Sequence, residues 1–298
     1  MWPGNSTLAT HTLDANAVRT HPRCGPVDQA PRKYRGPHQL SRNGWANFAE
    51  RLERSEEIAT ILSLTAGHAR VLDVGGGTGE LTRAVAAQIG KCTTVEPHRD
   101  RVAVLDAGGP AAAAVEVHPG RAEALPFADR SFDLVYTAWV LHYVQDLQQA
   151  LEEIARVCDD TNPDATIVVV GGSPDNELVR LLNDVCVPIA GEQPDHQGFL
   201  LAEAARVFSD HGFSEFSLLR TEAALHFPEV SEPDRITAAA ATLVDFWFEG
   251  HARAADMRRA LEPALREHFA RRPHAVGDQA TVLVARAPRL DNPNTGTA

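Results

Sequence analysis

The residues best suited to bind a ligand form one glycine-rich run, V-L-D-V-G-G-G-T-G-E, which follows a short apolar stretch. Within this run, one acid precedes four closely spaced glycines: Asp73, Gly75, Gly76, Gly77 and Gly79. Glycine lets the backbone turn tightly and approach a ligand closely, because it has no Cβ atom. A strand, a glycine turn and a following helix are typical of nucleotide-binding folds, so the run predicts a site for a nucleotide-like ligand.

Two common phosphate-binding patterns do not match this run. The dinucleotide pattern G-x-G-x-x-G needs its third glycine at position 80 or 82, where the sequence has Glu80 and Thr82. The P-loop pattern also fails, because no Gly-Lys-Ser/Thr ends the turn. Glu80 would repel a pyrophosphate at a helix N-terminus. A nucleoside that carries a cationic group and no phosphate fits the run better.

Three further segments follow the glycine run in a fixed order. They are T-V-E-P at the end of the next β-rich stretch, then GRAEALPFADRSFDLV, then T-A-W-V-L-H-Y-V. The residues singled out in these segments are Glu96, Pro97, Arg121, Ala122, Glu123, Ala138 and His142.

Taken together, the four segments resemble the class I S-adenosylmethionine-dependent methyltransferases, and within them the methyltransferase type 11 or ubiquinone/menaquinone-type branch. The resemblance covers about residues 66–172. It implies S-adenosylmethionine as the cofactor and no metal. The residues that it assigns to the cofactor are Tyr34, Asp73, Gly75, Gly77, Gly79, Glu96, Pro97, Arg121, Ala122, Glu123 and Ala138. Glu96 takes the place of the ribose-binding acid, because one carboxylate can accept hydrogen bonds from both ribose hydroxyls.

Two departures from the family pattern are visible. Arg121 stands where the family usually has an acid, so the side-chain contact to the adenine amino group is not expected here, and backbone groups near Ala122 are the remaining candidates for it. The usual L-K-P-G-G turn is replaced by C-D-D-T-N-P-D-A, which we interpret as a surface turn.

Two residues outside the glycine run have a chemical and a structural interpretation. His142 follows the strand beside which the methyl group is expected, so it is a candidate general base; the alternative is a structural imidazole bonded to backbone. Tyr34 is expected to close over the methionine end of the cofactor, since an aromatic face attracts a sulfonium. The alternative for Tyr34 is a packing aromatic. Asp73 has the second interpretation of a residue that organises the glycine loop.

The elements that must position these residues alternate between β-rich and helical stretches. Predicted strands cover 70–74, 92–96, 113–117, 132–137, 166–170, 213–220 and 281–286, and predicted helices cover 80–89, 99–107, 147–158, 176–187 and 203–211. Strands separated by helices indicate βαβ units. We therefore predict an α/β fold with a doubly wound, mainly parallel seven-stranded sheet and helical cap insertions.

The pattern also divides the chain. The predicted units are a disordered segment at 1–30, a helical N-terminal cap at 31–66, a methyltransferase domain at 67–287 with insertions near 173–200 and 229–272, and a flexible tail at 288–298. Insertions of this kind often cover the carboxyl edge of the sheet, where open α/β sheets bind ligands.

Composition excludes several classes of protein. The 298 residues carry a net charge of −12, which disfavours a nucleic-acid partner. No apolar run reaches the length of a membrane span, so we expect no membrane partner. Four cysteines lack metal or disulfide spacing. The N-terminus has no secretory pattern, which predicts a cytoplasmic location.

The predicted function is methyl transfer to nitrogen or oxygen of a small molecule of secondary metabolism, with an amine or a modified peptide as the favoured acceptor. One alternative is a C-methyltransferase of a quinone-like or otherwise activated carbon acceptor. Two alternatives come from other classes: a non-catalytic cofactor-binding partner subunit and a nicotinamide-dependent oxidoreductase. The missing third glycine disfavours the oxidoreductase. The sequence does not determine the oligomeric state.

Overall fold

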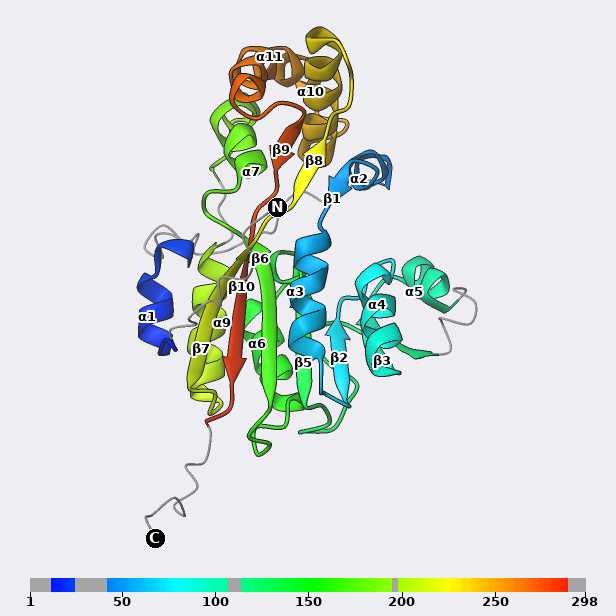
Figure 1. Ribbon diagram of the computed structural model, residues 1–298, viewed down its shortest axis with the longest axis vertical. Helices are drawn as coiled ribbons and strands as arrows, with labels where there is room; N and C mark the ends of the chain where they lie inside the picture. The colour runs from blue at the N-terminus through cyan, green and yellow to red at the C-terminus, as the bar shows by residue number, and fades with distance from the viewer. Residues whose placement is uncertain (1–11, 25–41, 107–113, 195–197, 289–298) are drawn as a thin grey trace, which may run out of the picture.

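The computed structural model describes residues 12–24, 42–106, 114–194 and 198–288 (Figure 1). Its centre is a seven-stranded sheet in the order β4-β3-β2-β5-β6-β10-β7. The strands are β2 (Val71–Val74), β3 (Cys92–Glu96), β4 (Val115–Pro119), β5 (Leu134–Ala138), β6 (Thr166–Gly172), β7 (Glu215–Thr221) and β10 (Ala280–Arg286). Only β10 runs antiparallel to its neighbours in this sheet, β6 and β7. The predicted fold class is confirmed.

Helices cover both faces of this sheet, as a doubly wound fold requires. One face packs against α6 (Leu147–Val157) and α9 (Gly198–Asp210). The other packs against α3 (Ser55–Thr65) and α4 (Glu80–Ile89), while α5 (Arg99–Asp106) follows β3. Every residue of β6 is buried, because both faces of the strand are covered. Strand order reverses between β2 and β5, and ligands of open α/β sheets bind at such a point.

A second lobe stands above the carboxyl ends of the parallel strands (Figure 1). Its small antiparallel sheet has the order β1-β8-β9. The lobe consists of α2 (Arg42–Ala49), β1 (Leu52–Glu53), α7 (Glu177–Leu181), the π-helical turn η5 (Leu182–Cys186), α8 (Val187–Ala190), β8 (Ala224–His226), α10 (Glu232–Phe248), α11 (Ala254–Arg271) and β9 (Ala275–Gly277). These segments share one hydrophobic core. Residues 42–53 of the predicted N-terminal cap and parts of the two predicted insertions therefore meet in a single lobe, which we call the cap lobe. Helix α3, which lies within the predicted cap, packs on the large sheet instead.

The expected disorder of residues 1–30 is wrong for residues 12–24. Asp14 caps helix α1 (Ala15–Thr20) by accepting a hydrogen bond from the Ala17 N–H at 2.7 Å. The 3₁₀ turn η1 (Pro22–Cys24) follows, and the side chains of Val18 and Cys24 are completely buried. Contacts with α9 and β7 order this segment, although its own sequence has no apolar periodicity. Residues 1–11 and 25–30 lie outside the described residues, as does the tail from 289 onward.

The predicted element bounds differ from the observed ones in several places. The 80–89 helix and the 92–96 strand match, and most other ends move by one or two residues. The helix expected at 176–187 is instead α7, a π-helical turn and α8. The helix expected at 203–211 begins five residues earlier, at Gly198. Nowhere in the described ranges does a helix have the length and apolar character needed to cross a bilayer.

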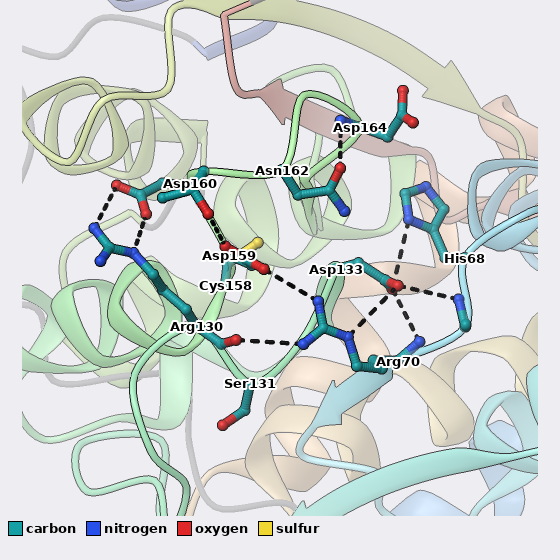
Figure 2. Close-up of polar contacts among 12 residues, drawn as sticks. His68, Arg70, Arg130, Ser131, Asp133, Cys158, Asp159, Asp160, Asn162 and Asp164 are labelled. Atoms are coloured by element: carbon teal, nitrogen blue, oxygen red, sulfur yellow. Dashed lines mark hydrogen bonds and ion pairs between the residues drawn. The ribbon is translucent and has the colours of Figure 1, made fainter.

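The amino ends of β2, β5 and β6 are joined by a cluster of charged side chains, shown in Figure 2. Asp133 accepts hydrogen bonds from the N–H groups of Ala69 at 3.2 Å and Arg70 at 3.0 Å. The Arg70 guanidinium donates to Asp159 at 3.1 Å. Arg130 pairs with Asp160 at 2.5 Å. We call Arg70, Asp133, Asp159, Arg130 and Asp160 the amino-edge cluster; it includes part of the predicted surface turn at 158–165.

Candidate functional site

The glycine loop connects β2 to α4 at the carboxyl edge of the sheet. Gly75 and Gly79 have φ angles of +87° and +83°, a region that side chains disfavour. A Cβ atom on Gly75 would collide with the side chain of Val140, and one on Gly79 would collide with Leu105. A Cβ atom on Gly76 would collide with Thr94. Packing therefore requires glycine at these three positions.

Gly77 differs from the other glycines of the loop. Its φ angle is +58°, and a Cβ atom built there would have no atom within 4 Å. Its N–H donates a hydrogen bond to Glu96 at 3.0 Å. The loop thus exposes bare backbone to open space, beside a carboxylate. This arrangement can receive a nucleoside, and it fits the cofactor that the sequence pattern implies.

Asp73 lies inside the protein and organises the loop. Its side chain is 3% exposed, and Thr82 on α4 donates a hydrogen bond to it at 2.6 Å. Burial raises the pKa of Asp73 to about 6, although hydrogen bonds from Thr82 and Tyr136 oppose the shift. The contacts support the interpretation that Asp73 holds α4 against β2.

Glu96 ends β3 and its side chain is 2% exposed. One carboxylate oxygen accepts the Gly77 N–H, and the other accepts the His98 N–H at 3.0 Å. Pro97, which lies between Glu96 and His98 in the chain, is exposed. Each carboxylate oxygen can accept a second hydrogen bond. Glu96 therefore joins the glycine loop to the end of β3 and keeps acceptor capacity for a hydroxyl.

Arg121, Ala122 and Glu123 form a tight turn after β4. The Arg121 guanidinium is exposed and lies 3.3 Å from the Glu123 carboxylate. Glu123 also accepts the Gln145 N–H at 2.7 Å. Partial burial raises the pKa of Glu123, but these contacts outweigh it and the pKa is lowered from its ordinary value. Glu123 thus ties this turn to the loop after β5, and Ala122 within the turn is buried.

Strand β5 ends at Ala138, which is partly exposed, and the loop that follows brings two rings to the same edge of the sheet. The rings of Trp139 and His142 meet edge-on with centroids 6.5 Å apart. His142 is 5% exposed, and burial lowers its pKa to about 3. The imidazole is therefore neutral near neutral pH. Its role as a general base stays a prediction.

Sequence reasoning missed a buried acid, Glu57. Its side chain is 1% exposed and accepts a hydrogen bond from the Trp139 indole N–H at 2.9 Å. On helix α3 the buried positions are Glu57, Ile61 and Thr65, spaced four residues apart. An acid in line with the buried stripe of a helix was the available signal, since acids are almost never fully buried without a partner.

Tyr34, predicted to close over the cofactor, lies outside the described residues. Across the described ranges, no three His, Cys, Asp or Glu side chains are grouped as metal ligands.

Comparison with known proteins finds a match over the segment that carries this geometry. Residues 72–161 match the family model described as a methyltransferase domain. This segment, which is less than half of the chain, is similar to a methyltransferase domain. The matched segment includes the glycine loop, Glu96, the 121–123 turn and the loop after β5. S-adenosylmethionine is accordingly the cofactor of this domain.

Two curated relatives resemble this domain. The ubiquinone/menaquinone biosynthesis C-methyltransferase UbiE of Hahella chejuensis is 33% identical over 156 residues, which are 48% of this chain and 61% of the relative. The uncharacterized methyltransferase YcgJ of Bacillus subtilis is 34% identical over 90 residues, which are 30% of this chain and 36% of the relative. The chain thus spans less than two thirds of either relative.

Solved structures share the fold. A protein from Anabaena variabilis, described as a methyltransferase from an antibiotic biosynthesis pathway, superposes with a TM-score of 0.54 at 17% identity. The match covers 79% of this chain and 98% of that one. At this identity the likeness establishes the methyltransferase fold, which agrees with the sheet order described above.

Proposed function

We propose that the protein transfers a methyl group from S-adenosylmethionine to a nitrogen or oxygen atom of a small, natural-product-like acceptor. An amine or a modified peptide is the class that we favour. The observation that carries this preference is that two acids lie near tryptophans at the carboxyl edge, with Arg54 paired to one of them, Glu80. Glu57 contacts Trp139 there, and Glu80 lines a cavity together with Trp45.

S-adenosylmethionine carries the methyl group on a positively charged sulfur. The protein must place the acceptor atom in line with the bond between that sulfur and the methyl carbon. The bare backbone at Gly77 would border the nucleoside, and Glu96 would accept a hydrogen bond from the ribose. Asp73 and Thr82 hold the loop in this shape. An acceptor amine must be neutral to react, so its proton must first leave.

Acids beside aromatic rings favour a cationic or amine-bearing ligand for two reasons. A carboxylate attracts an ammonium group, and the face of an indole attracts it as well. The cavity at the carboxyl edge measures about 250 Å³ and is lined by Trp45, Glu53, Arg54 and Glu80, among others. A space of this size suits part of a small molecule.

The principal alternative is methylation of carbon. It is supported by the similarity to relatives named ubiquinone/menaquinone biosynthesis C-methyltransferase UbiE. In that case the acceptor is a quinone-like ring whose carbon is activated by loss of a proton.

Ligand-dependent thermal stability tests the cofactor first. S-adenosylhomocysteine, S-adenosylmethionine, NADH and NADPH are compared at equal concentration. A ligand at about 100 times its Kd stabilises a protein by about 2.7 kcal/mol. We expect the first two to raise Tm and the nicotinamides to leave it unchanged. Stabilisation by a nicotinamide alone would contradict the proposed function.

Methyl transfer is then tested with methyl-labelled S-adenosylmethionine and three sets of acceptors: amines, including peptides with a free amine; phenols and alcohols; and quinol-like rings. We expect labelled product with the amines. Label in the ring carbon of a quinol would favour the C-methyltransferase instead. Cofactor binding without product from any acceptor would favour the non-catalytic partner subunit.

A further inference from the structure

The carboxylate of Glu57 is buried, and only one of its two oxygens accepts a hydrogen bond. One oxygen accepts the Trp139 indole N–H at 2.9 Å. The other oxygen is buried and has no hydrogen bond. The nearest positive charge faces that second oxygen: the Arg54 guanidinium at 3.7 Å. A buried carboxylate with an unbonded oxygen lowers the stability of the fold. A role in function, rather than in stability, would therefore explain its presence.

Trp139, the partner of Glu57, is held in an uncommon backbone conformation. Its φ angle is +59°, in the left-handed region that bulky residues rarely adopt. It directly follows β5, and the next residue, Val140, packs over Gly75 of the glycine loop. Strain of this kind persists where the surroundings impose it and is frequent at functional sites. The indole is partly exposed, at the edge of the sheet where the methyl group is expected.

Arg54 links Glu57 to the glycine loop from the other side. Its guanidinium pairs with Glu80 at 2.6 Å, and Glu80 is the first residue of α4 after Gly79. Arg54 and Glu80 also line the cavity described above. Glu57 therefore lies between two features of the site, the ring of Trp139 and the Arg54–Glu80 pair.

We propose that Glu57 is a positioning residue for methyl transfer. Its carboxylate holds the Trp139 indole at the carboxyl end of β5, and the placement of this ring and of Arg54 changes with the ionisation of Glu57. The function assigned to Glu57 rests on the proposed methyltransferase activity. The contacts themselves do not depend on it.

The charge on Glu57 follows from its surroundings. Burial raises its pKa to about 7, and Arg54 and the Trp139 N–H oppose this shift. Asp278, on the link from β9 to β10, and Glu80 on α4 add to it. When ionised, Glu57 attracts Arg54 and strengthens the hydrogen bond from the indole. When protonated, it loses its attraction for Arg54, which then pairs with Glu80 alone.

Tryptophan fluorescence of the full chain, without ligand, tests this proposal. The pH is varied between about 5 and about 9. Wild type is compared with Glu57→Gln, Trp139→Phe and the control Glu56→Gln, whose carboxylate is exposed one residue away on the same helix. We expect a transition near pH 7 in wild type and in Glu56→Gln. It should be absent from Glu57→Gln and Trp139→Phe.

A transition that persists unchanged in Glu57→Gln would overturn the proposal, as would its absence from wild type. Circular dichroism verifies that each variant is folded. Glu57→Asp is the second variant, because it keeps the charge but draws it away from the indole; its transition should shift rather than disappear.

Kinetics then tests the link to catalysis. In Glu57→Gln we expect the Kd of S-adenosylhomocysteine to stay within about two-fold, while kcat loses its dependence on pH near neutrality. An unchanged pH profile would reject the positioning role. If no acceptor is methylated by wild type, the proposed function fails, but the fluorescence titration still decides whether Glu57 controls Trp139.

Discussion

Two acids at the amino edge of the sheet, Asp133 and Asp159, and two at the carboxyl edge, Asp73 and Glu57, are held under opposite conditions. In the amino-edge cluster, Asp133 accepts two backbone N–H groups (Figure 2). Hydrogen bonds from Thr161 and Arg70 lower the pKa of Asp159. At the carboxyl edge, burial raises the pKa of Asp73 and of Glu57. The amino-edge acids stabilise the fold, whereas burial disfavours the ionised form of Asp73 and Glu57, so that ionising them costs stability.

This difference separates acids with a candidate functional role from acids with a structural role. Desolvated carboxylates near a ligand loop are typical of binding and catalytic sites. Fully bonded acids at a distance from it are typical of structural links. Variants at the two edges should therefore separate ligand binding from stability.

The largest effect on ligand binding is expected at Gly75. Gly75→Ala adds strain of about 2 kcal/mol and drives a methyl group into Val140. We expect the affinity for S-adenosylhomocysteine, measured by calorimetry, to fall by about ten-fold or more. Gly90→Ala is the control, because Gly90 also has a positive φ angle but open space around it. Equal losses in the two variants would contradict the role of the Gly75–Val140 contact.

A loss of stability at all pH values, without a change in ligand binding, is expected at the amino edge. Asp133→Ala leaves the N–H groups of Ala69 and Arg70 without their acceptor, which should lower the free energy of unfolding by about 2 kcal/mol. Denaturant titration measures this loss. The Kd of S-adenosylhomocysteine should not change. A weakened Kd would show that the two edges are coupled.

Glu57→Gln should change stability in a pH-dependent way. The folded pKa, about 7, lies above the ordinary value of 4.5, so the native state binds more protons than the unfolded state between these pH values. Wild type therefore loses stability as the pH rises through this window. Glu57→Gln cannot ionise at this position, so its free energy of unfolding does not fall for this reason. Relative to wild type, it should gain up to about 3 kcal/mol at high pH and nothing at low pH.

Denaturant unfolding at both ends of that pH window measures the difference. Glu56→Gln should behave as wild type throughout. A Glu57→Gln variant that is less stable than wild type at high pH would mean that the ionised carboxylate stabilises the protein after all.

The smallest effect is expected at His142. Because burial lowers its pKa to about 3, the imidazole is a weak base near neutral pH. His142→Gln should reduce the methylation rate only a few-fold and leave cofactor affinity unchanged. A general base contributes about 100-fold or more. A loss of that size in the rate, with unchanged affinity, would establish His142 as the base.

Much of the fold and of the candidate cofactor site could be predicted because the signals are local. The glycine loop, Glu96 at a strand end and the apolar run of β6 are each specified by a few adjacent residues. The three-stranded sheet of the cap lobe was not predicted. Its strands are two or three residues long and come from distant parts of the chain. No short window of sequence carries such a signal.

The sequence by itself determined the class of sheet, the order of the candidate ligand-binding segments and the need for glycine in the loop, since strand burial and turn geometry act over neighbouring residues. The tertiary structure alone decided which side chains meet. Glu57 and Trp139 are 82 residues apart and form one hydrogen bond. Burial then set the charge of Glu57 and of His142, because desolvation depends on what surrounds a group in space and not on its neighbours along the chain.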